Sequence, residues 1–441
     1  MRFKIERMGS DGEGIAYHKN KPVYFYYTYL GEEVEAELVM NKRGAQEANL
    51  VEVIKPSPYR RDVTWPYYMK SGSVNLSHIN YLEQLKYKRD VLNFLFVTNL
   101  KNETNKIKID LTVPAISELN YRNKSYIPVV NVNNKNYMAN YTRGSNQTFV
   151  VDELLTEAKI IEITAKQVLS LMDKHGFNAY NFRAKKGHIL ALDLRANQLG
   201  EVQLTFVLKK KVNLTNIVEE ISKKYKHIVS IYENYVPDYR NSPDIYNGTL
   251  NLIGGNKYLE MEINNFKFYL TPFAFFQLNT NQAEKLYNIV IEKGSFKKDD
   301  LVLDAYSGVG TIATHISPYV KKVVAIESIK DAVNDMNYSL KVNKISNVKT
   351  ITGDFVKLVS YLKEDFNKMI FNPPRVGLGE EVCNYIIKKE PKEVIYISCN
   401  PKTLVKDLKL LTKKYNINSI TPFDMFPQTS QIETIVVLKL K

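Results

Sequence analysis

From about residue 263 onward, short apolar runs alternate with helical stretches, and this alternation limits the possible folds more than any other feature. The five runs with the character of buried strands are 301–303, 323–326, 348–352, 369–371 and 394–397. Helical stretches separate most of them, which is typical of a doubly wound, mostly parallel sheet. A last strand is expected over 434–440. Ligands of such sheets bind at the carboxyl ends of the strands, so the residues after each run are candidate site residues.

The first 57 residues have another pattern, of short strands separated by turns. Strands are expected over 23–27, 34–39 and 50–54, with glycine-containing turns at 12–14 and 30–32. We predict a five-stranded barrel of the OB type, a fold that commonly binds single-stranded nucleic acid. An SH3-like barrel or another β-accessory domain fits the same pattern.

The middle of the chain, residues 58–262, mixes helix and strand. Helices are expected over 81–95 and 218–225, because their apolar residues have helical spacing. Residues 196–200, between the apolar runs 189–192 and 202–208, have the composition of a hairpin turn. We predict a central α+β domain that serves as a scaffold or binding domain, followed by a third domain over 263–441. No catalytic motif is found in this central part.

The charge balance favours a polyanionic partner. The chain of 441 residues has 61 Lys and Arg against 47 Asp and Glu, a net charge of +14. Nucleic acid or a membrane surface would match this charge, although a general lysine bias of the proteome would also produce it. The two cysteines, Cys383 and Cys399, are too few for a disulfide scaffold and fit a reducing cytosol. The start of the chain lacks the apolar region of a signal peptide, and we predict a cytoplasmic protein without a membrane partner.

Two of the strand ends indicate a nucleotide-type cofactor. Residues 304–311 read Asp-Ala-Tyr-Ser-Gly-Val-Gly-Thr, where glycines permit close backbone approach and a helix start adds positive potential. Glu327, after the second run, is placed to accept hydrogen bonds from a ribose. NAD and S-adenosylmethionine proteins share both features, and residues 308–313 also satisfy the loose dinucleotide pattern. Asp304 ahead of the glycines and Asn-Pro-Pro-Arg at 372–375 favour a methyltransferase.

Two further residues carry reactive side chains near strand ends. Cys399, in Ser-Cys-Asn-Pro after the fifth run, is placed as a nucleophile, although an isolated cysteine is more often a small buried hydrophobe. Cys383 lies in a helical stretch and is expected to pack in the core. Glu433 ends an irregular segment, 423–433, just before the last strand. It could be a general base or a solvated acid.

Taken together, these motifs resemble those of one family, the S-adenosylmethionine-dependent RNA uracil-5-methyltransferases, which make 5-methyluridine. The resemblance rests on Phe-Phe-Gln-Leu-Asn at 275–279 with Gln-Ala-Glu-Lys-Leu-Tyr at 282–287, on the glycine loop, on Asn-Pro-Pro-Arg, on Ser-Cys-Asn-Pro and on Asp-Met-Phe-Pro…Glu, in the family's order. It covers nearly the whole chain. The N-terminal barrel resembles a TRAM domain, an RNA-binding module typical of the branch that acts on large-subunit ribosomal RNA.

The resemblance implies a role for each candidate residue. Gln277, Tyr306, Glu327 and Asn372 would form the cofactor and active-site set, with S-adenosylmethionine as the methyl donor. Cys399 would be the nucleophile and Glu433 the base. The C-terminal domain would have the Rossmann-like class I methyltransferase fold. The expected substrate is a uridine in RNA, most of all 23S ribosomal RNA, and the expected state is a monomer without a metal.

Three departures from the family pattern alter these expectations. Many relatives carry an iron–sulfur cluster held by four cysteines, but residues 71–78 contain none, so no cluster is expected. The family's Asp-Pro-Pro-Arg is Asn-Pro-Pro-Arg here, so Asn372 lacks the charge. The histidines usual before the final glutamate are Gln428 and Gln431. Arg375 follows the prolines where N-methyltransferases have an aromatic residue, which argues against N-methylation.

Three alternatives to a ribosomal RNA uracil-5-methyltransferase stay open at this point. The first is a tRNA uracil-5-methyltransferase, whose common bacterial form lacks the TRAM domain. The second is an RNA N-methyltransferase, for which Cys399 would be dispensable. The third is a non-catalytic RNA-binding or ribosome-assembly protein; Asn372 favours it weakly, whereas the intact glycine loop, Cys399 and Glu433 argue against it.

Overall fold

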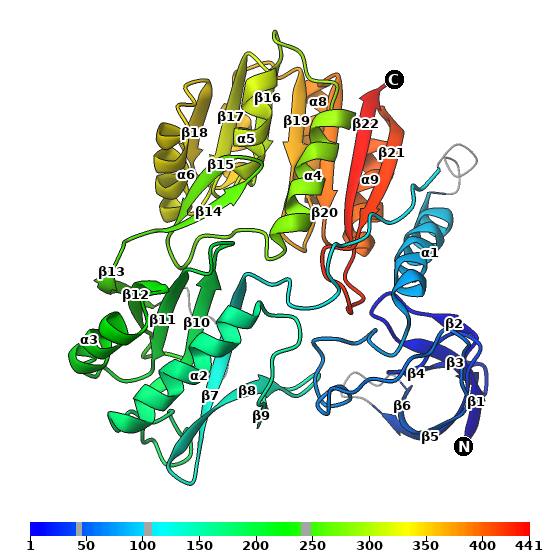
Figure 1. The fold of residues 1–441 in the computed structure, drawn as a ribbon. Coiled ribbons are helices and arrows are strands. Elements are labelled where there is room, and N and C mark those ends of the chain that lie inside the picture. Colours follow the sequence, from blue (N-terminus) through cyan, green and yellow to red (C-terminus); the bar gives the residue numbers. More distant parts are fainter. Residues whose placement is uncertain (41–45, 101–107, 240–247) are drawn as a thin grey trace. The chain divides into compact units, whose positions relative to one another are not determined.

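The computed structural model describes residues 1–40, 46–100, 108–239 and 248–441. The chain forms two compact units, and each unit gathers stretches that are far apart in the sequence (Figure 1). Unit 1 consists of Met1–Glu118, Glu292–Gly294 and Tyr361–Lys441; unit 2 consists of Leu119–Ile291 and Ser295–Ser360. The division into domains 1–57, 58–262 and 263–441 stays a prediction.

Unit 1 begins with a six-stranded sheet in the order β1-β5-β6-β4-β3-β2. Its strands are β1 (Arg2–Lys4), β2 (Arg7–Met8), β3 (Gly14–His18), β4 (Lys21–Phe25), β5 (Glu33–Met40) and β6 (Gln46–Lys55). Strand β5 alternates buried and exposed residues, with Val34 and Ala36 in the core. The sheet has six strands and not the predicted five. Strands β1 and β2 span only three and two residues, which is too short for an alternating pattern to be recognised in the sequence.

An irregular segment and a long helix follow this sheet in unit 1. Helix α1 (Tyr81–Asn99) starts where predicted, because the side chain of Asn80 caps it by accepting from the backbone N–H of Glu83. In the segment before it, the fully buried His78 lies against the hydroxyl of Tyr68 and, at 3.1 Å, the carbonyl of Thr28. Burial lowers the pKa of His78 to about 3, so this ring is neutral at physiological pH.

The C-terminal part of unit 1 is a sheet portion in the order β19-β20-β22-β21. Its elements are β19 (Lys368–Phe371), α8 (Gly379–Lys389), β20 (Glu393–Ser398), α9 (Pro401–Leu411), β21 (Tyr415–Phe423) and β22 (Glu433–Leu440). Strands β19 and β20 are parallel, whereas β22 runs antiparallel to both β20 and β21. Every residue of β20 is buried, as expected of a strand covered on both faces.

The C-terminal part of unit 2 continues the β/α pattern. Strands β16 (Leu301–Ala305), β17 (Lys322–Glu327) and β18 (Val348–Thr352) are parallel and adjacent in that order. The other elements of this part are β14 (Leu259–Ile263), β15 (Phe266–Leu270), α4 (Thr280–Lys293), α5 (Thr311–Ile316), η2 (Ser317–Tyr319), α6 (Lys330–Val342), α7 (Phe355–Leu358) and η3 (Val359–Tyr361). All five predicted runs are therefore strands, but β18, at the edge of its sheet, has no buried residue.

Unit 2 also holds a second sheet, in the order β13-β12-β11-β10-β7-β8-β9. Its strands are β7 (Lys124–Val132), β8 (Lys135–Tyr141), β9 (Thr148–Val150), β10 (Ile189–Ala196), β11 (Val202–Leu208), β12 (Ile228–Tyr235) and β13 (Thr249–Gly255). Helices α2 (Lys159–Lys174) and α3 (Thr215–Lys224) pack against this sheet and against each other. The predicted hairpin at 196–200 is confirmed, since it joins the antiparallel strands β10 and β11.

Candidate active site

Cys399 directly follows β20 in unit 1 and is half-buried. The next residue, Asn400, caps helix α9: its side-chain oxygen accepts from the backbone N–H of Lys402 at 3.1 Å. The amide nitrogen of Asn400 donates to the carbonyl of Arg375 at 2.9 Å. The Asn-Pro pair after the cysteine therefore starts a helix and fixes the turn that presents the thiol.

Glu433 lies opposite Cys399 at the end of the neighbouring strand. In the antiparallel ladder of β20 and β22, Ser398 pairs with Thr434. Continuing that register by one residue places Cys399 beside Glu433. The Glu433 side chain is buried, with 3% of the residue exposed, so the alternative of a solvated acid was wrong. A thiol and a buried carboxyl therefore stand side by side in unit 1.

Burial disfavours the charged forms of both groups. Burial raises the pKa of Glu433 to about 8, opposed by the positive charge of Arg375. Burial also raises the pKa of the Cys399 thiol to about 11; the charge of Glu433 raises it too, whereas Arg375 lowers it. A carboxyl with a pKa near 8 is a suitable base for a carbon acid at neutral pH. Arg375 is the cation that favours ionisation of both groups.

Asn372 and Arg375 belong to the turn that follows β19. Because β19 and β20 are parallel and adjacent, Asn372 and Cys399 emerge at the same edge of the sheet. Asn372 is half-buried and Arg375 is exposed. The carbonyl of Arg375 also accepts from the Thr403 hydroxyl at 3.2 Å, so this turn is tied to the start of α9.

The glycine loop and Glu327 form a second set of residues, in unit 2. Tyr306 follows β16 with a left-handed backbone (φ 60°), and Glu327 ends β17. The register of these strands pairs Ala305 with Ile326, so Tyr306 and Glu327 come next to each other. One oxygen of the Glu327 carboxylate accepts from the backbone N–H of Gly308 at 2.9 Å. The loop is thus folded back onto the acid that was predicted to bind a ribose.

Two residues flanking this loop explain its conformation. The fully buried Asp304 accepts from the backbone N–H of Ala313 at 3.0 Å and so holds the first turn of α5. Burial raises the pKa of Asp304 to about 7. Gly310 has φ 76°, and a Cβ on it would lie 2.5 Å from the sulfur of Met336. Only glycine fits there without a shift.

Gln277 lies in unit 2, in the segment between β15 and α4, and only 6% of it is exposed. Its carbonyl accepts from the side chain of Asn123 at 2.8 Å, and the same amide nitrogen donates to Thr280 at 3.0 Å. Sequence reasoning missed Asn123, because a lone asparagine more than 150 positions earlier has no local signal that connects it to the site.

The structure thus places the predicted residues in two sets. Cys399, Glu433 and Asn372 are in unit 1, and Gln277, Tyr306 and Glu327 are in unit 2. Cys383 is fully buried in α8, as predicted. Within the described parts of the chain, no group of three or more His, Cys, Asp or Glu side chains could hold a metal ion. No helix among the residues described is both long and apolar enough to cross a bilayer.

One solved structure has a similar fold over nearly the whole chain. The tRNA (uracil-54, C5)-methyltransferase of Pyrococcus abyssi, solved in complex with S-adenosyl-L-homocysteine, matches with a TM-score of 0.79. The match covers 99% of this chain and 100% of that one at 22% sequence identity. The predicted mixed α/β fold, with a strand-rich N-terminal region and a C-terminal methyltransferase fold, is confirmed by this similarity.

The sequence comparisons identify the family. The pattern of the tRNA (uracil-5-)-methyltransferase family matches residues 80–441. An uncharacterized RNA methyltransferase of Bacillus anthracis is 31% identical over 99% of this chain and 96% of that protein. Another, from Lactobacillus johnsonii, is 32% identical over 99% and 97%. The chain therefore belongs to the tRNA (uracil-5-)-methyltransferase family, and it is an RNA methyltransferase.

Proposed function

We propose that this protein transfers a methyl group from S-adenosylmethionine to C5 of a uridine in RNA through a covalent adduct with Cys399. The observation that carries this proposal is the pair of Cys399 and Glu433 at the ends of two adjacent strands. N-methylation and a purely binding function need neither a cysteine nor a base at these positions.

The chemistry of uracil explains why these two groups are needed together. C5 is a poor nucleophile until the Cys399 thiol loses its proton to solvent and adds to C6 as a thiolate, which forms the Sγ–C6 bond and an enolate that reacts at C5. After methyl transfer, Glu433 takes the proton from C5. The electron pair of that C–H bond restores the C5–C6 double bond and expels the thiolate. Atoms and electrons balance without a metal or a redox partner.

The residues of the second set fit an S-adenosyl group. Glu327 offers a carboxylate to the ribose hydroxyls, and the loop at Gly308 is open, since an added Cβ would meet only the carbonyl of Phe275 at 3.9 Å. Tyr306 and Gln277, in the same unit, complete this set, and Asn372, in unit 1, is the fourth residue proposed for the cofactor. When bound, the sulfonium supplies the methyl group.

Large-subunit ribosomal RNA is the proposed substrate. The N-terminal six-stranded sheet of unit 1 resembles a TRAM domain, the module that is typical of the ribosomal RNA branch. The excess of 61 basic over 47 acidic residues would provide phosphate contacts. A uridine in a single-stranded loop leaves its stack at lower cost than one in a duplex. We further propose that the protein acts as a cytoplasmic monomer.

The proposed mechanism is tested with RNA in which 5-fluorouridine replaces uridine. A base can remove hydrogen from C5 as a proton but cannot remove fluorine, which would have to leave as F⁺. The adduct is therefore trapped after methyl transfer. We expect a covalent complex that resists denaturation with wild-type protein and with Cys383→Ala, but not with Cys399→Ala. Absence of the complex with wild-type protein, or its persistence in Cys399→Ala, would contradict the mechanism.

The proposed substrate needs a separate experiment. Mass mapping of ribosomal RNA and tRNA from a deletion strain should show the loss of a 5-methyluridine in 23S ribosomal RNA. Restoration by wild-type protein, but not by Cys399→Ala, is the matched control. Loss from tRNA alone would support the alternative of a tRNA uracil-5-methyltransferase.

A further inference from the structure

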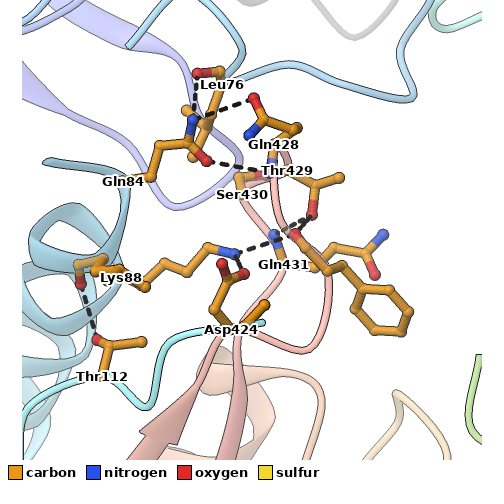
Figure 2. A network of polar contacts seen from close by, with 12 residues as sticks. Leu76, Gln84, Lys88, Thr112, Asp424, Gln428, Thr429, Ser430 and Gln431 are labelled. Atoms are coloured by element: carbon orange, nitrogen blue, oxygen red, sulfur yellow. Dashed lines mark hydrogen bonds and ion pairs between the residues drawn. The ribbon is translucent and has the colours of Figure 1, made fainter. Parts of the chain in front are cut away.

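A buried polar network in unit 1 connects helix α1 to the residues just before Glu433 (Figure 2). These residues, 424–432, form the irregular connector between β21 and β22. Gln84 and Lys88 are four residues apart on α1 and so lie on one face of the helix. Both are fully buried, although α1 has exposed positions for polar side chains. We call Gln84 and Lys88, with their partners Asp424 and Gln428, the α1 clamp.

One half of the α1 clamp is a buried ion pair. The Lys88 ammonium contacts the Asp424 carboxylate, and both side chains have no exposed surface. Lys88 also donates to the carbonyl of Phe426 at 3.2 Å. Burial lowers the pKa of Lys88, and the charge of Asp424 opposes that shift. A buried charge that loses its partner is strongly destabilised, so this pair holds the connector in a defined position.

The other half is a pair of amides. Gln84 accepts from the backbone N–H of Gln428 at 3.1 Å and donates to the Gln428 side-chain oxygen at 3.2 Å. The Gln428 carbonyl accepts from the backbone N–H of Leu76 at 2.9 Å. Gln428 has φ 69°, a left-handed conformation that a non-glycine residue keeps only when its surroundings fix it. The backbone of the connector at Gln428 is therefore held by Gln84 of the α1 clamp together with Leu76.

The α1 clamp acts next to the candidate base. In the ladder of β21 and β22, Phe423 pairs with Glu433, so Asp424 is adjacent to the strand partner of Glu433. Phe423 is itself bridged to Val113, whose carbonyl accepts from the backbone N–H of Asp424 at 3.0 Å. A shift of the connector would thus displace the first residue of β22. Cys399 follows β20 and is held by other contacts, those of Asn400 and Arg375.

We propose that Gln84 and Lys88 are positioning residues for Glu433 and that they act on the elimination step. This inference rests on the proposed function. Since Glu433 removes the C5 proton only after methyl transfer, a displaced carboxylate should leave adduct formation intact and slow the breakdown of the adduct. A merely structural role would instead lower both rates by the same factor.

The test compares two rates in the full-length protein. The rate of adduct formation is measured with 5-fluorouridine RNA and S-adenosylmethionine, and the rate of 5-methyluridine release with unmodified RNA. For Lys88→Met and for Gln84→Met we expect adduct formation close to the wild-type rate, whereas release slows about tenfold to a hundredfold. The methylated adduct should accumulate on unmodified RNA, and mass spectrometry would detect it.

The control is another buried ion pair of unit 1. Lys368 donates to Glu393 at 2.8 Å, and Glu393 is the first residue of β20, at the end away from Cys399. Like Lys88→Met, Lys368→Met removes the cation of a buried ion pair, but it should leave the ratio of the two rates unchanged. If Lys88→Met does not fold, Lys88→Met/Asp424→Leu replaces both charges by apolar groups, an exchange that proteins often tolerate. The same change in the ratio is expected for it.

Two results would overturn the positioning role. The first is an equal loss of both rates in Gln84→Met and in the Lys88 variants, and the second is that folded variants keep the wild-type rate for both steps. If wild-type protein still forms the adduct, either result would contradict the positioning role of the α1 clamp and leave the proposed function intact. No adduct from wild-type protein would contradict the proposed function itself.

Discussion

At the scale of single residues, Arg375 is the cation that adjusts both reactive groups. It lowers the pKa of Glu433 and of Cys399, while burial raises both. A base acts only when deprotonated, so adduct breakdown should rise with pH through the pKa of Glu433, which is about 8. This interpretation gives Arg375 an electrostatic role that the sequence pattern alone did not assign.

Neutralising Arg375 should move this pH dependence. Without the positive charge the pKa of Glu433 rises, because the carboxylate loses the partner that favoured it. We expect the pH midpoint for 5-methyluridine release to shift upward in Arg375→Gln, by about one unit or less for an exposed cation, and to stay in place in Arg375→Lys. Identical midpoints in wild-type protein and in Arg375→Gln would contradict this role.

At the scale of elements, the glycine loop between β16 and α5 has left-handed backbone angles at Gly308 and Gly310, which are unfavourable for residues with a side chain. In Gly310→Ala the added Cβ meets both a left-handed φ and the sulfur of Met336 at 2.5 Å. We expect the free energy of unfolding to fall by about 1–3 kcal/mol, measured by urea denaturation. Gly176→Ala, with φ 73° and no atom within 4 Å, is the matched control for backbone strain alone. Equal losses in the two variants would show that the contact with Met336 costs nothing.

The elements also show where sequence reasoning stops. The strands β16, β17, β19 and β20 are predictable because each is a buried apolar run. Helix α1 is predictable because its apolar residues have helical spacing and the capping residue Asn80 marks its start. Strand β21 was missed, since Asn416, Asn418 and Ser419 interrupt its apolar pattern.

The candidate site is only partly contained in local patterns. Each motif could be read from its own stretch of sequence, but the pairing of Cys399 with Glu433 depends on the ladder of β20 and β22. The link between Gln84 and Gln428 joins residues 344 positions apart, and nothing local specifies it. Sequence reasoning therefore named the candidate side chains and missed the contacts that hold them.

At the scale of the whole molecule, the net charge of +14 predicts strongly salt-dependent binding of RNA. Each phosphate contact to a single strand adds about −0.7 to the slope of log affinity against log salt, so about six contacts would weaken binding a few hundredfold between 50 and 200 mM salt. Filter binding at several salt concentrations measures this slope. The affinity for S-adenosylmethionine is the control and should change little. A slope near zero would exclude a phosphate-dominated interface.

The most direct test of the central claim uses Glu433→Gln with unmodified RNA. The amide cannot take the C5 proton, so the reaction should stop after methyl transfer. We predict that mass spectrometry of the digested complex finds the peptide with Cys399 linked to a methylated uridine nucleotide. Free Cys399 peptide together with ready formation of 5-methyluridine by this variant would contradict the account.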